Sequence, residues 1–598
     1  MPNTPKPLTA APAPDLNWSR DVTPASEHYG DIYFSVDGGL AETRTVFLQG
    51  CGLPHAWEDV DIFTIGELGF GSGLNFLAAW ELWQRTAKPE QILHFVSIEA
   101  FPWSCDDLRK GLAHWPELEP LAKRLIEQWP GQVKGVHRIH FGNVSLTLFH
   151  MPVRTALSSM NAKIDAWFLD GFSPDKNSDM WSDDVFKSLA EHSNSGATLA
   201  TFTVAGHVRR GLSEAGFSAV KKPGFGRKRE RLEAIFRGEA RKTYTHSQTH
   251  SPVIIGGGIA GASIAKAYHR RGISPVLIDP EPDLQSAASG NPRALVMPRL
   301  DVQDRPESRF FLAAYLYALG KYQAEDTVCH TGVFQKAKSQ TEALRFEKLI
   351  RYAPLPVEHM TLMSQEQARN MCGLEIDCEF GGLYFKHAQT IDPKKTIRKW
   401  TQNCQRIKDG AARISKHDDL WVVYNDSGKI LAKTDALFIT PGANILDLAA
   451  LDVRFTRGQI CWGESEVRSN TALIYGGYCL PYQDGVLLGA SHDHVGAGQN
   501  NRVSDKDRHE VMDEYSKIIH DKLLISSFQS RASVRVTTKN TLPIAAPYKD
   551  GCYVLSGLGS RGFMMAPLLG EALVCAARGE PSPLCLKTSV RFGAREKS

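Results

Sequence analysis

The sequence predicts an α/β protein with two parallel-sheet domains in series, and two observations carry this prediction. The chain of 598 residues is longer than the roughly 250–300 residues at which a single hydrophobic core stops growing. Residues 61–99 and 253–279 each combine an apolar strand, a glycine-rich turn, a helix-like run and a second strand that ends in a carboxylate. This order is typical of the nucleotide-binding half of a doubly wound sheet. We therefore expect a first domain at 1–238, a polar linker at 239–251 and a second domain at 252–598.

Composition excludes several classes of protein. The net charge of +3 provides no global field, so binding to a nucleic acid would need a local basic patch. The eleven cysteines are spread without C-x-x-C spacing, which argues against a disulfide framework or a structural zinc site. Neither they nor His492 and His494 form a metal-binding pattern, so no metal is expected. The sequence shows no signal peptide and no run of about 18 apolar residues, so we expect a cytoplasmic protein without a membrane segment.

The first domain is expected to open with a loose arm and a short hairpin. Residues 1–20 are rich in proline and alanine and show no periodicity. Residues 30–35 and 45–48 are apolar or aromatic and flank Gly38 and Gly39, which predicts two short strands joined by a turn. A longer apolar strand then leads into the first glycine-rich turn.

The first glycine-rich turn has the pattern acid-x-G-x-G-x-G. Its residues are Glu67, Gly69, Gly71 and Gly73, and the strand after the following helix ends at Glu99. This arrangement resembles motif I of class I S-adenosylmethionine (SAM) methyltransferases, whose fold is Rossmann-like. The resemblance implies that the glycines let the backbone approach the amino-acid part of SAM and that Glu99 holds the ribose hydroxyls. The alternative is a glycine turn in another kind of α/β domain.

A candidate base for methyl transfer follows the apolar strand at 164–169. Ligands of parallel sheets bind beyond the carboxyl ends of the strands, so Asp170 is expected to project at the methyl donor. A carboxylate there can take the proton of an ammonium acceptor and so expose the nitrogen lone pair. The alternative role of Asp170 is to cap the next helix or turn. The preceding strand, at 146–150, is followed by no acid between Met151 and Ser159, whereas many class I methyltransferases carry one there, close to the SAM adenine.

A basic segment lies near the end of the first domain. Six of the eleven side chains from residue 221 to residue 231 are basic and one is acidic. Basic groups beside an aromatic residue and glycines can hold the phosphates of a nucleic acid. The candidates for this role are Lys221, Lys222, Arg227, Lys228 and Arg229. A solvated hairpin tip explains the same composition equally well.

The second glycine-rich turn has the pattern G-x-G-x-x-G. Gly256, Gly258 and Gly261 lie between an apolar strand and a helix-like run, and a second strand ends at Asp279. The glycines allow the tight turn, the approach of a pyrophosphate and the packing of the helix, while the carboxylate suits a ribose hydroxyl. We therefore predict a dinucleotide site, with a purely structural turn as the alternative.

The remaining segments of the second domain follow a recognisable order. We predict a helix at 308–324, a strand and turn at 435–443, a hairpin at 480–489, and a strand, glycine turn and helix at 553–567. The small residues that permit close approach of a ligand are Ser289, Gly290, Gly559, Ser560 and Gly562. This order resembles the D-amino acid oxidase and glycine oxidase superfamily. The resemblance implies an FAD-binding Rossmann domain with an inserted α+β substrate domain, although Thr440-Pro441-Gly442 replaces the usual Ala-Thr-Gly turn.

Two arginines are candidates for the substrate site of such an oxidase. Arg535 occupies the position at which these oxidases clamp the substrate carboxylate, and the guanidinium fork suits that anion. Arg561, in the last glycine turn, is a second candidate at the flavin. The alternative for each arginine is a surface or structural role.

The combined signatures resemble a family of bifunctional enzymes that modify the wobble uridine of tRNA. The signatures are residues 66–73, 165–174 with Asn177, Met180 and Trp181, 224–226, 256–261 and 557–562. The resemblance implies FAD-dependent removal of the carboxymethyl group from 5-carboxymethylaminomethyl-(2-thio)uridine, and then SAM-dependent methylation of the remaining amine. It also implies tRNA as the partner, and we expect a monomer. The alternatives are a small-molecule amino-acid oxidase fused to an N-methyltransferase, and a flavoprotein scaffold that binds tRNA without catalysis.

Overall fold

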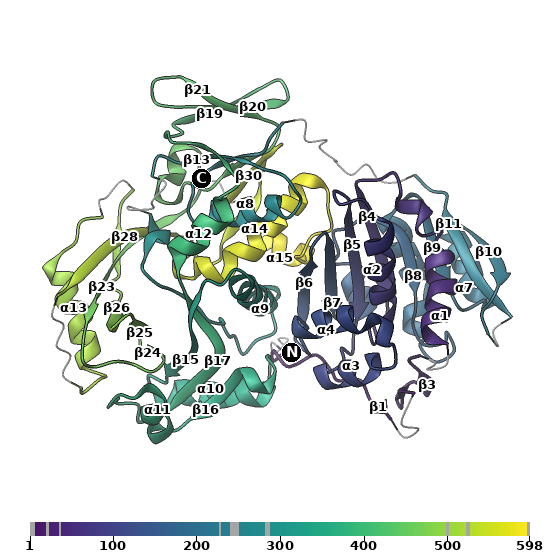
Figure 1. Cartoon of the computed structure of the whole chain (residues 1–598), viewed down its shortest axis with the longest axis horizontal. Helices are drawn as coiled ribbons and strands as arrows, with labels where there is room; N and C mark the ends of the chain where they lie inside the picture. Colours follow the sequence, from purple (N-terminus) through teal and green to yellow (C-terminus); the bar gives the residue numbers. More distant parts are fainter. Residues whose placement is uncertain are drawn as a thin grey trace, which may run out of the picture. The chain divides into compact units, whose positions relative to one another are not determined.

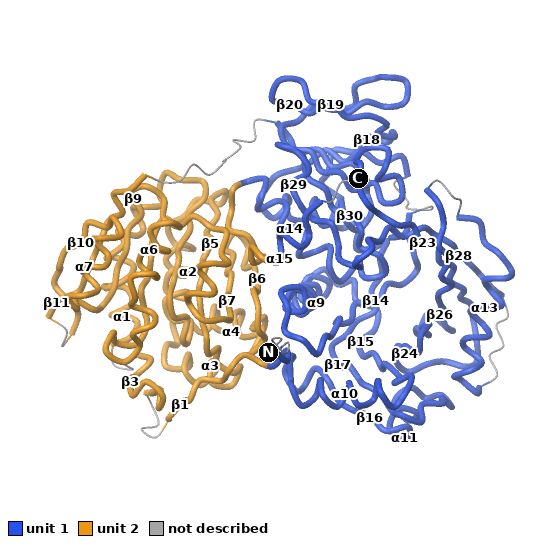
Figure 2. The backbone as a smooth tube through the Cα atoms, turned by 180° about the vertical axis from the view of Figure 1, so that it is seen from behind, with its two compact units in different colours: residues 1–9, 246–578, 588–598 blue, residues 10–245, 579–587 orange. Residues whose placement is uncertain are grey.

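The computed structural model describes residues 6–18, 23–34, 38–226, 229–239, 250–281, 287–497, 501–521 and 527–594. Within the chain two compact units are distinguished (Figure 2). Unit 2 comprises Ala10–Thr245 and Gly579–Lys587, and unit 1 comprises Met1–Thr9, His246–Arg578 and Thr588–Ser598. The change of unit after Thr245 falls within the predicted linker, of which residues 240–249 lie outside the described residues. The two ends differ from the expected division, because Gly579–Lys587 belongs to unit 2 and Met1–Thr9 to unit 1.

Unit 2 is built on an eight-stranded sheet with the order β10-β11-β9-β8-β4-β5-β7-β6 (Figure 1). The strands are β4 (Ile62–Leu68), β5 (Ile92–Glu99), β6 (Gly135–Phe141), β7 (Val144–His150), β8 (Ile164–Leu169), β9 (Ser193–Thr201), β10 (Phe217–Pro223) and β11 (Glu230–Phe236). The central strands β4, β5, β7, β8 and β9 run parallel, and β6, β10 and β11 run antiparallel to their neighbours. The parallel sheet predicted for the first domain is therefore confirmed.

Helices cover both faces of this sheet. One face carries α2 (Leu74–Thr86), α3 (Cys105–Leu112) and α4 (Glu119–Glu127), and the other carries α5 (Val153–Leu157), α6 (Asp183–His192) and α7 (Gly206–Glu214). Phe168 packs in the first core and the adjacent Trp167 in the second, because successive side chains of a strand point to opposite faces. A sheet buried on both faces explains why these strands are continuous apolar runs.

The strand predicted at 45–48 is wrong. The chain there forms α1 (Gly39–Thr43) and then a π-helical turn (Arg44–Gln49). The three apolar side chains of this turn are buried in the core of unit 2, and the ring of Phe47 lies 5.5 Å from that of Phe168. Burial against the sheet outweighs the preference of valine and phenylalanine for strands.

The hairpin predicted from residues 30–35 and 45–48 does not form, whereas the hairpin given as the alternative for the basic segment does. Of the described residues 30–34, only β3 (Asp31–Ile32) is a strand, and it pairs with β2 (Ala25–Ser26), which precedes it, instead of with a later segment. A third short strand, β1 (Leu16–Asn17), completes this small sheet. The basic segment, in contrast, is the end of a hairpin, because β10 and β11 pair in antiparallel register.

Unit 1 contains a six-stranded sheet with the order β18-β13-β12-β22-β30-β29. The strands are β12 (Val253–Ile255), β13 (Val276–Ile278), β18 (Gln405–Ile407), β22 (Leu437–Ile439), β29 (Ile544–Lys549) and β30 (Cys552–Ser556). All neighbours are parallel except β29 and β30. Strand β12 leads into the second glycine turn and α8 (Ile259–His269), and α8 packs against α14 (Gly562–Arg578). The predicted dinucleotide-binding fold is confirmed.

Unit 1 also contains a ten-stranded mixed sheet (Figure 1) and a three-stranded sheet of β19, β20 and β21. The strands of the ten-stranded sheet are β14 (Ala294–Val296), β15 (Val328–Lys336), β16 (Met360–Met363), β17 (Gly382–Ile391), β23 (Arg454–Glu464), β24 (Ala472–Ile474), β25 (Tyr478–Tyr482), β26 (Gly485–Gly489), β27 (Asp493–Val495) and β28 (Gln529–Thr537). The other elements are α9 (Pro306–Ala324), α10 (Gln340–Tyr352), α11 (Gln365–Cys372), α12 (Pro393–Thr401), β19 (Arg413–His417), β20 (Leu420–Tyr424), β21 (Ile430–Thr434), α13 (Asp505–Ser516) and α15 (Leu586–Arg591). Helix α9 and the β25–β26 hairpin match the predictions for 308–324 and 480–489.

The segment Gly579–Lys587 completes unit 2 through buried polar contacts. The Glu580 carboxylate lies 3.4 Å from His94 Nε2, and neither side chain is exposed. Arg138 Nη2 donates a hydrogen bond to the Pro581 carbonyl at 2.5 Å. The Ser582 and Leu586 amides donate to carbonyls of the loop after α5. These buried contacts therefore join parts of the chain that are more than 400 residues apart, since Arg138 and Pro581 are separated by 443 positions.

Glu580→Ala is expected to lower the free energy of unfolding of unit 2 by about 1–3 kcal/mol, because the buried imidazole of His94 then loses its carboxylate partner. Chemical denaturation followed by tryptophan fluorescence measures this change. Glu127→Ala, which removes an exposed glutamate at the end of α4, is the matched control. Equal denaturation midpoints for both variants would show that Gly579–Lys587 contributes nothing to unit 2.

Candidate functional sites

A cavity of about 1020 Å³ opens at the carboxyl ends of β4, β5 and β8 in unit 2. The three strands are parallel neighbours, so the residues that follow them meet at one edge of the sheet. Gly69 and Gly71 follow β4, Glu99 ends β5 and Asp170 follows β8, and all four line the cavity. The structure thus brings together residues that are up to 101 positions apart in the sequence (170 minus 69).

The first glycine turn fits closely against the sheet. Gly69 has a φ of +91°, and a Cβ there would lie 2.0 Å from the Asp170 carbonyl oxygen. Gly73, with a φ of +79°, is the residue before α2. Glu99 accepts hydrogen bonds from the amides of Gly71 at 2.9 Å and Phe101 at 2.8 Å, and burial raises the pKa of its carboxyl. Glu99 lines the cavity and its carboxylate can accept hydrogen bonds from hydroxyls, so the turn and Glu99 fit the ribose end of SAM.

A buried hydrogen-bond network holds Asp170. Asn75 Nδ2 donates to Asp170 Oδ2 at 2.7 Å and to Glu67 Oε1 at 3.0 Å. Thr43 Oγ1 donates to Asn75 Oδ1 at 2.8 Å, and Ser97 Oγ donates to Glu67 Oε2 at 2.6 Å. Glu67 is fully buried beneath the cavity and is not part of its lining. Glu67, which was predicted to touch the cofactor, therefore lies behind Asn75. No role for Asn75 was predicted from the sequence.

Glu67 loses its proton at a higher pH than an ordinary glutamate does. Burial raises its pKa from 4.5 to about 8, and the nearby Asp170 also raises it, while the hydrogen bonds from Ser97 and Asn75 lower it. This raised pKa favours the protonated form of Glu67 at neutral pH. A neutral Glu67 avoids placing a second negative charge beside the Asp170 carboxylate.

Glu67→Gln is expected to raise the free energy of unfolding of unit 2, relative to the wild type, as the pH rises from about 5 to about 8. The unfolded chain loses this proton near pH 4.5, whereas the folded chain keeps it to about pH 8. The folded state binds more protons in this window, so its free energy of unfolding falls as the pH rises. Glutamine does not titrate, so between about pH 5 and pH 8 the variant should gain about 1 kcal/mol per pH unit over the wild type. Urea denaturation at several pH values measures this gain. Glu127→Gln is the control, and its free energy of unfolding should differ from that of the wild type by the same amount at every pH.

The strand before β8 in the sequence is β7, which confirms the strand predicted at 146–150. Pro152 and Val153 follow it and line the cavity. The segment from Met151 to Ser159 contains no acid, so this part of the lining is apolar. The missing acid, which departs from the usual pattern of class I methyltransferases, therefore leaves this part of the cavity wall without a carboxylate.

The basic hairpin reaches the same cavity. Phe225 and Gly226, at its end, belong to the lining, and Gly224 N–H donates to the Arg229 carbonyl. Lys221 forms an ion pair with Glu230 at 2.7 Å, whereas Lys222 and Arg229 are exposed. Arg227 and Lys228 lie outside the described residues.

The second glycine turn in unit 1 has the contacts expected of a dinucleotide site. Gly256 has a φ of +99°, and a Cβ there would lie 2.4 Å from the Thr440 carbonyl oxygen. Asp279 Oδ2 accepts a hydrogen bond from the Gly257 amide at 2.5 Å, and burial raises the pKa of this carboxyl. Ser289 Oγ accepts from the Ile259 amide at the start of α8. Gly258 in this turn is half-buried, and the glycine backbone with the Asp279 carboxylate fits the pyrophosphate and ribose of FAD.

Contacts at four further positions complete this turn. A Cβ on Gly261 would lie 2.0 Å from the Gly256 carbonyl oxygen, and one on Gly258 would lie 3.2 Å from Ser289 Oγ. Gly290 is buried next to Ser289. Thr440 Oγ1 donates to the Gly256 carbonyl at 3.0 Å, so the departure at Thr440-Pro441 leaves the turn closed.

The last glycine turn lies against the second. A Cβ on Gly562 would lie 3.3 Å from Ile259 at the start of α8, and one on Gly559 would lie 3.2 Å from Thr537 at the end of β28. Ser560 and Arg561 in this turn are exposed, and partial desolvation together with the like charge of Arg299 lowers the pKa of Arg561. The structure therefore brings the C-terminal turn, the dinucleotide turn and the end of β28 together.

Arg535 lies on β28, two residues before Thr537. A Cβ on Gly458 would lie 2.4 Å from Arg535 Nη2, so a glycine in the neighbouring strand makes room for the guanidinium. Arg535 Nη2 lies 2.8 Å from His492 Nδ1, and desolvation followed by the charge of Arg535 lowers the pKa of His492. A neutral His492 accepts this hydrogen bond and orients the arginine. The spacing of His492 in the sequence indicated no special role for it, since only the pairing of strands brings the two residues together.

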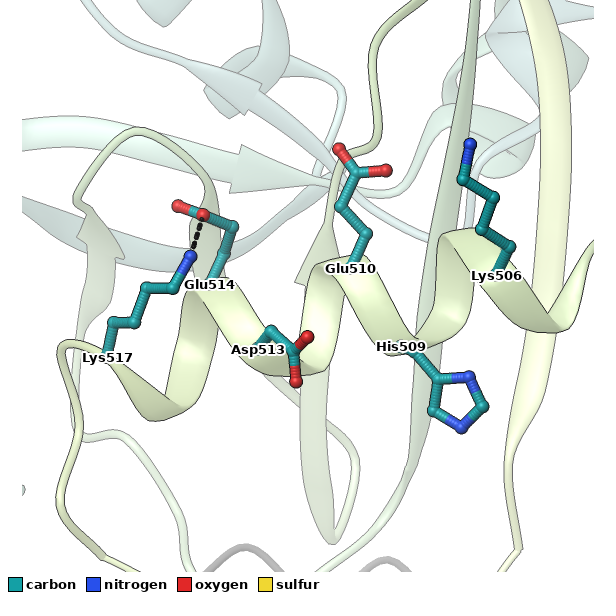
Figure 3. Close-up of a pocket in the computed structure, with 6 residues that line it drawn as sticks. All are labelled: Lys506, His509, Glu510, Asp513, Glu514 and Lys517. Carbon is teal, nitrogen blue, oxygen red and sulfur yellow. Dashed lines mark hydrogen bonds and ion pairs between the residues drawn. The ribbon is translucent and has the colours of Figure 1, made fainter.

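A second hollow follows the surface of α13 (Figure 3). It is lined by Lys506, His509, Glu510, Asp513, Glu514 and Lys517, and Lys517 is bonded to Glu514 at 2.8 Å. All six side chains come from α13 and the residue after it, so no second wall encloses a ligand there. In the described ranges no group of three or more His, Cys, Asp or Glu side chains is placed to hold a metal ion.

Comparison with known proteins identifies both units. Residues 116–237 match a family described as S-adenosyl-L-methionine-dependent methyltransferase, and residues 253–576 match one described as FAD dependent oxidoreductase. The tRNA 5-methylaminomethyl-2-thiouridine biosynthesis bifunctional protein MnmC of Caulobacter vibrioides is 41% identical over 579 residues, which cover 96% of each chain. The protein of the same name from Pseudomonas aeruginosa is 34% identical over 627 aligned positions that cover 95% of each chain.

The chain belongs to the MnmC family. It has a SAM-dependent methyltransferase domain followed by an FAD-dependent oxidoreductase domain, which confirms the resemblance, the fold class and both cofactors inferred from the sequence. Glycine oxidase from Geobacillus kaustophilus shares the fold of the MnmC oxidoreductase domain, with a TM-score of 0.51 and 17% identity over 58% of this chain and 99% of that chain. None of the helices in the described part of this MnmC chain has the length and apolar character that a bilayer crossing requires.

Proposed function

We propose that this chain performs two consecutive steps on the wobble uridine of tRNA. The first removes the carboxymethyl group from 5-carboxymethylaminomethyl-(2-thio)uridine, and the second methylates the aminomethyl group that remains. The observation that carries the proposal is the presence of both sites in one chain that aligns with MnmC proteins over 96% of its length. We further propose that the protein is a cytoplasmic monomer, and the absence of disulfides among the cysteines in the described ranges supports a reducing compartment.

The oxidation step depends on holding a secondary amine that carries a carboxylate. When bound, FAD accepts a hydride from the carbon next to the amine nitrogen. Water then hydrolyses the resulting imine, the carboxymethyl carbons leave as an aldehyde, and a primary amine remains on the uridine. Arg535 binds the substrate carboxylate through its guanidinium, and His492 keeps the guanidinium in place. Ser289 and Asp279 hold the turn that receives the cofactor.

The methylation step depends on a neutral amine. When bound, SAM supplies a methyl group for attack by the nitrogen lone pair. Asp170 accepts the proton of the ammonium form, and the hydrogen bond from Asn75 fixes the position of the Asp170 carboxylate. Lys222 and Arg229 on the hairpin beside the cavity bind phosphates of the tRNA.

A nucleoside analysis tests the function. Purified protein is incubated with FAD, SAM and tRNA that carries the carboxymethylaminomethyl group, and the digested nucleosides are measured by mass spectrometry. We expect the aminomethyl nucleoside with FAD alone and the methylaminomethyl nucleoside when SAM is added. Turnover of free glycine with unchanged tRNA would support the small-molecule oxidase instead. A flavin that is not bleached by any substrate would support the non-catalytic scaffold.

A further inference from the structure

The loop after Asp170 carries an aromatic ring into the methyltransferase cavity. Phe172 stacks on Tyr29, with ring centroids 4.6 Å apart and an angle of 28° between the rings. The ring of Tyr33 meets Phe172 edge-on at 5.0 Å. All three residues line the cavity that also contains Asp170. Phe172 and Tyr29 are only partly buried, which distinguishes them from the rings of the hydrophobic core.

Several contacts fix this aromatic cluster in place. Trp181 Nε1 donates a hydrogen bond to the Phe172 carbonyl at 2.9 Å. The Ser173 amide donates to Asp31 Oδ2 at 3.2 Å, which ties the loop after β8 to the turn that carries Tyr29 and Tyr33. Tyr33 packs edge-on against Trp103, which is fully buried. The rings are therefore held in position before any ligand binds, so stacking on them needs little further ordering.

We propose that Phe172, supported by Tyr29, is a stacking platform for the nucleobase that carries the acceptor amine. The proposal rests on the proposed function and names the subsite at which the wobble base is held. Enzymes that act on a base take it out of its stack and hold it against aromatic side chains. Single-stranded loops of RNA are recognised in the same way, and an anticodon loop presents such a base. A small free amine offers no flat surface that would use this platform.

The position of the platform favours the acceptor base over the adenine of SAM. Phe172 lies on the loop after β8, two residues after Asp170, the proposed proton acceptor. Glu99, the proposed ligand of the SAM ribose, lies at the end of a different strand, β5. Asn177 also lines the cavity. Its side-chain Nδ2 makes only a weak contact, with the Met180 sulfur at 3.8 Å. Its amide is available to a polar edge of a stacked uracil.

The test measures methylation of tRNA that already carries the aminomethyl group. Loss of one base–aromatic stack predicts that Phe172→Leu raises KM for this tRNA by about 5- to 100-fold. We expect kcat at saturating tRNA to change less than about threefold, because stacking is equal in the ground and transition states. Phe172→Tyr and Phe172→Trp should restore a KM close to that of the wild type, which a loss of folding would not allow.

Two further measurements identify the ligand of the platform. Calorimetric titration with SAM should give the same Kd for Phe172→Leu and the wild type, and oxidation of carboxymethylaminomethyl tRNA should be unchanged. Phe380→Leu, which removes an exposed ring of unit 1, is the matched control. A weakened SAM Kd would assign the platform to the cofactor adenine and overturn the proposal, as would an unchanged KM. If the wild-type protein does not methylate aminomethyl tRNA at all, the proposed function fails, and the platform fails with it.

Discussion

Asp170→Asn is expected to reduce kcat for methylation by about 10²–10⁴-fold, the usual contribution of a positioned general base. Asparagine keeps the size of the side chain and its contact with Asn75, but it cannot accept a proton from the ammonium. The aminomethyl nucleoside should accumulate on tRNA, while its formation from the carboxymethylaminomethyl precursor continues at the normal rate. Single-turnover methylation followed by nucleoside mass spectrometry measures both steps in one sample.

The control for this variant is Asp179→Asn, because Asp179 is an exposed carboxylate that lines the same cavity. A comparable loss in both variants would mean that the charge of the cavity, and not a base at Asp170, limits the reaction. Full activity of Asp170→Asn would remove the base assignment. SAM binding measured by calorimetry should be equal in all three proteins, since the contacts of Glu99 lie elsewhere in the cavity.

Arg535→Ala is expected to raise KM for the carboxymethylaminomethyl substrate by about 10²–10³-fold. Truncating one partner of a hydrogen-bonded charge pair costs about 2–5 kcal/mol, and here the substrate carboxylate would lose its guanidinium. Arg535→Lys should give a smaller rise in KM, because lysine keeps the charge but loses the planar fork. Steady-state oxidation kinetics measure the effect, and the flavin absorbance of the purified variant shows whether FAD is still bound.

Arg454→Ala on β23 is the matched control for Arg535, since Arg454 is an exposed arginine of the neighbouring strand. Its KM should equal that of the wild type. An unchanged KM for Arg535→Ala would assign the carboxylate to another group, with Arg561 as the next candidate. A variant that loses FAD would instead show that Arg535 supports the cofactor site.

The sequence predicted those parts of the protein that depend on local order. Strand, glycine turn, helix and acid follow one another within about 30–40 residues, so the positions of Gly69, Glu99, Gly256 and Asp279 at the ends of parallel strands could be inferred directly. The helical turn at 45–48 could not be inferred, because its apolar residues suit either a strand or a helical turn until the neighbouring sheet is known.

The missed residues share a different property. Asn75 lies in the second position of α2, where nothing in the local pattern shows that its amide joins Glu67 to Asp170. His492 meets Arg535 only because β23 pairs with both β27 and β28. These contacts arise from the pairing of distant segments, and the sequence of a single protein does not contain that information in readable form.

The return of Gly579–Lys587 to unit 2 has a consequence for how this protein is made. Translation releases residues 10–245 first, but the carboxylate that lies beside the buried His94 is encoded 335 codons after Thr245. At about 5–20 residues per second, a ribosome needs roughly 15–70 s to reach it. During that interval His94 lacks the Glu580 carboxylate, and Arg138 lacks the Pro581 carbonyl to which it donates. The first domain to leave the ribosome is therefore the last to be finished, and a stop codon placed in the linker would yield a methyltransferase that lacks one of its own parts.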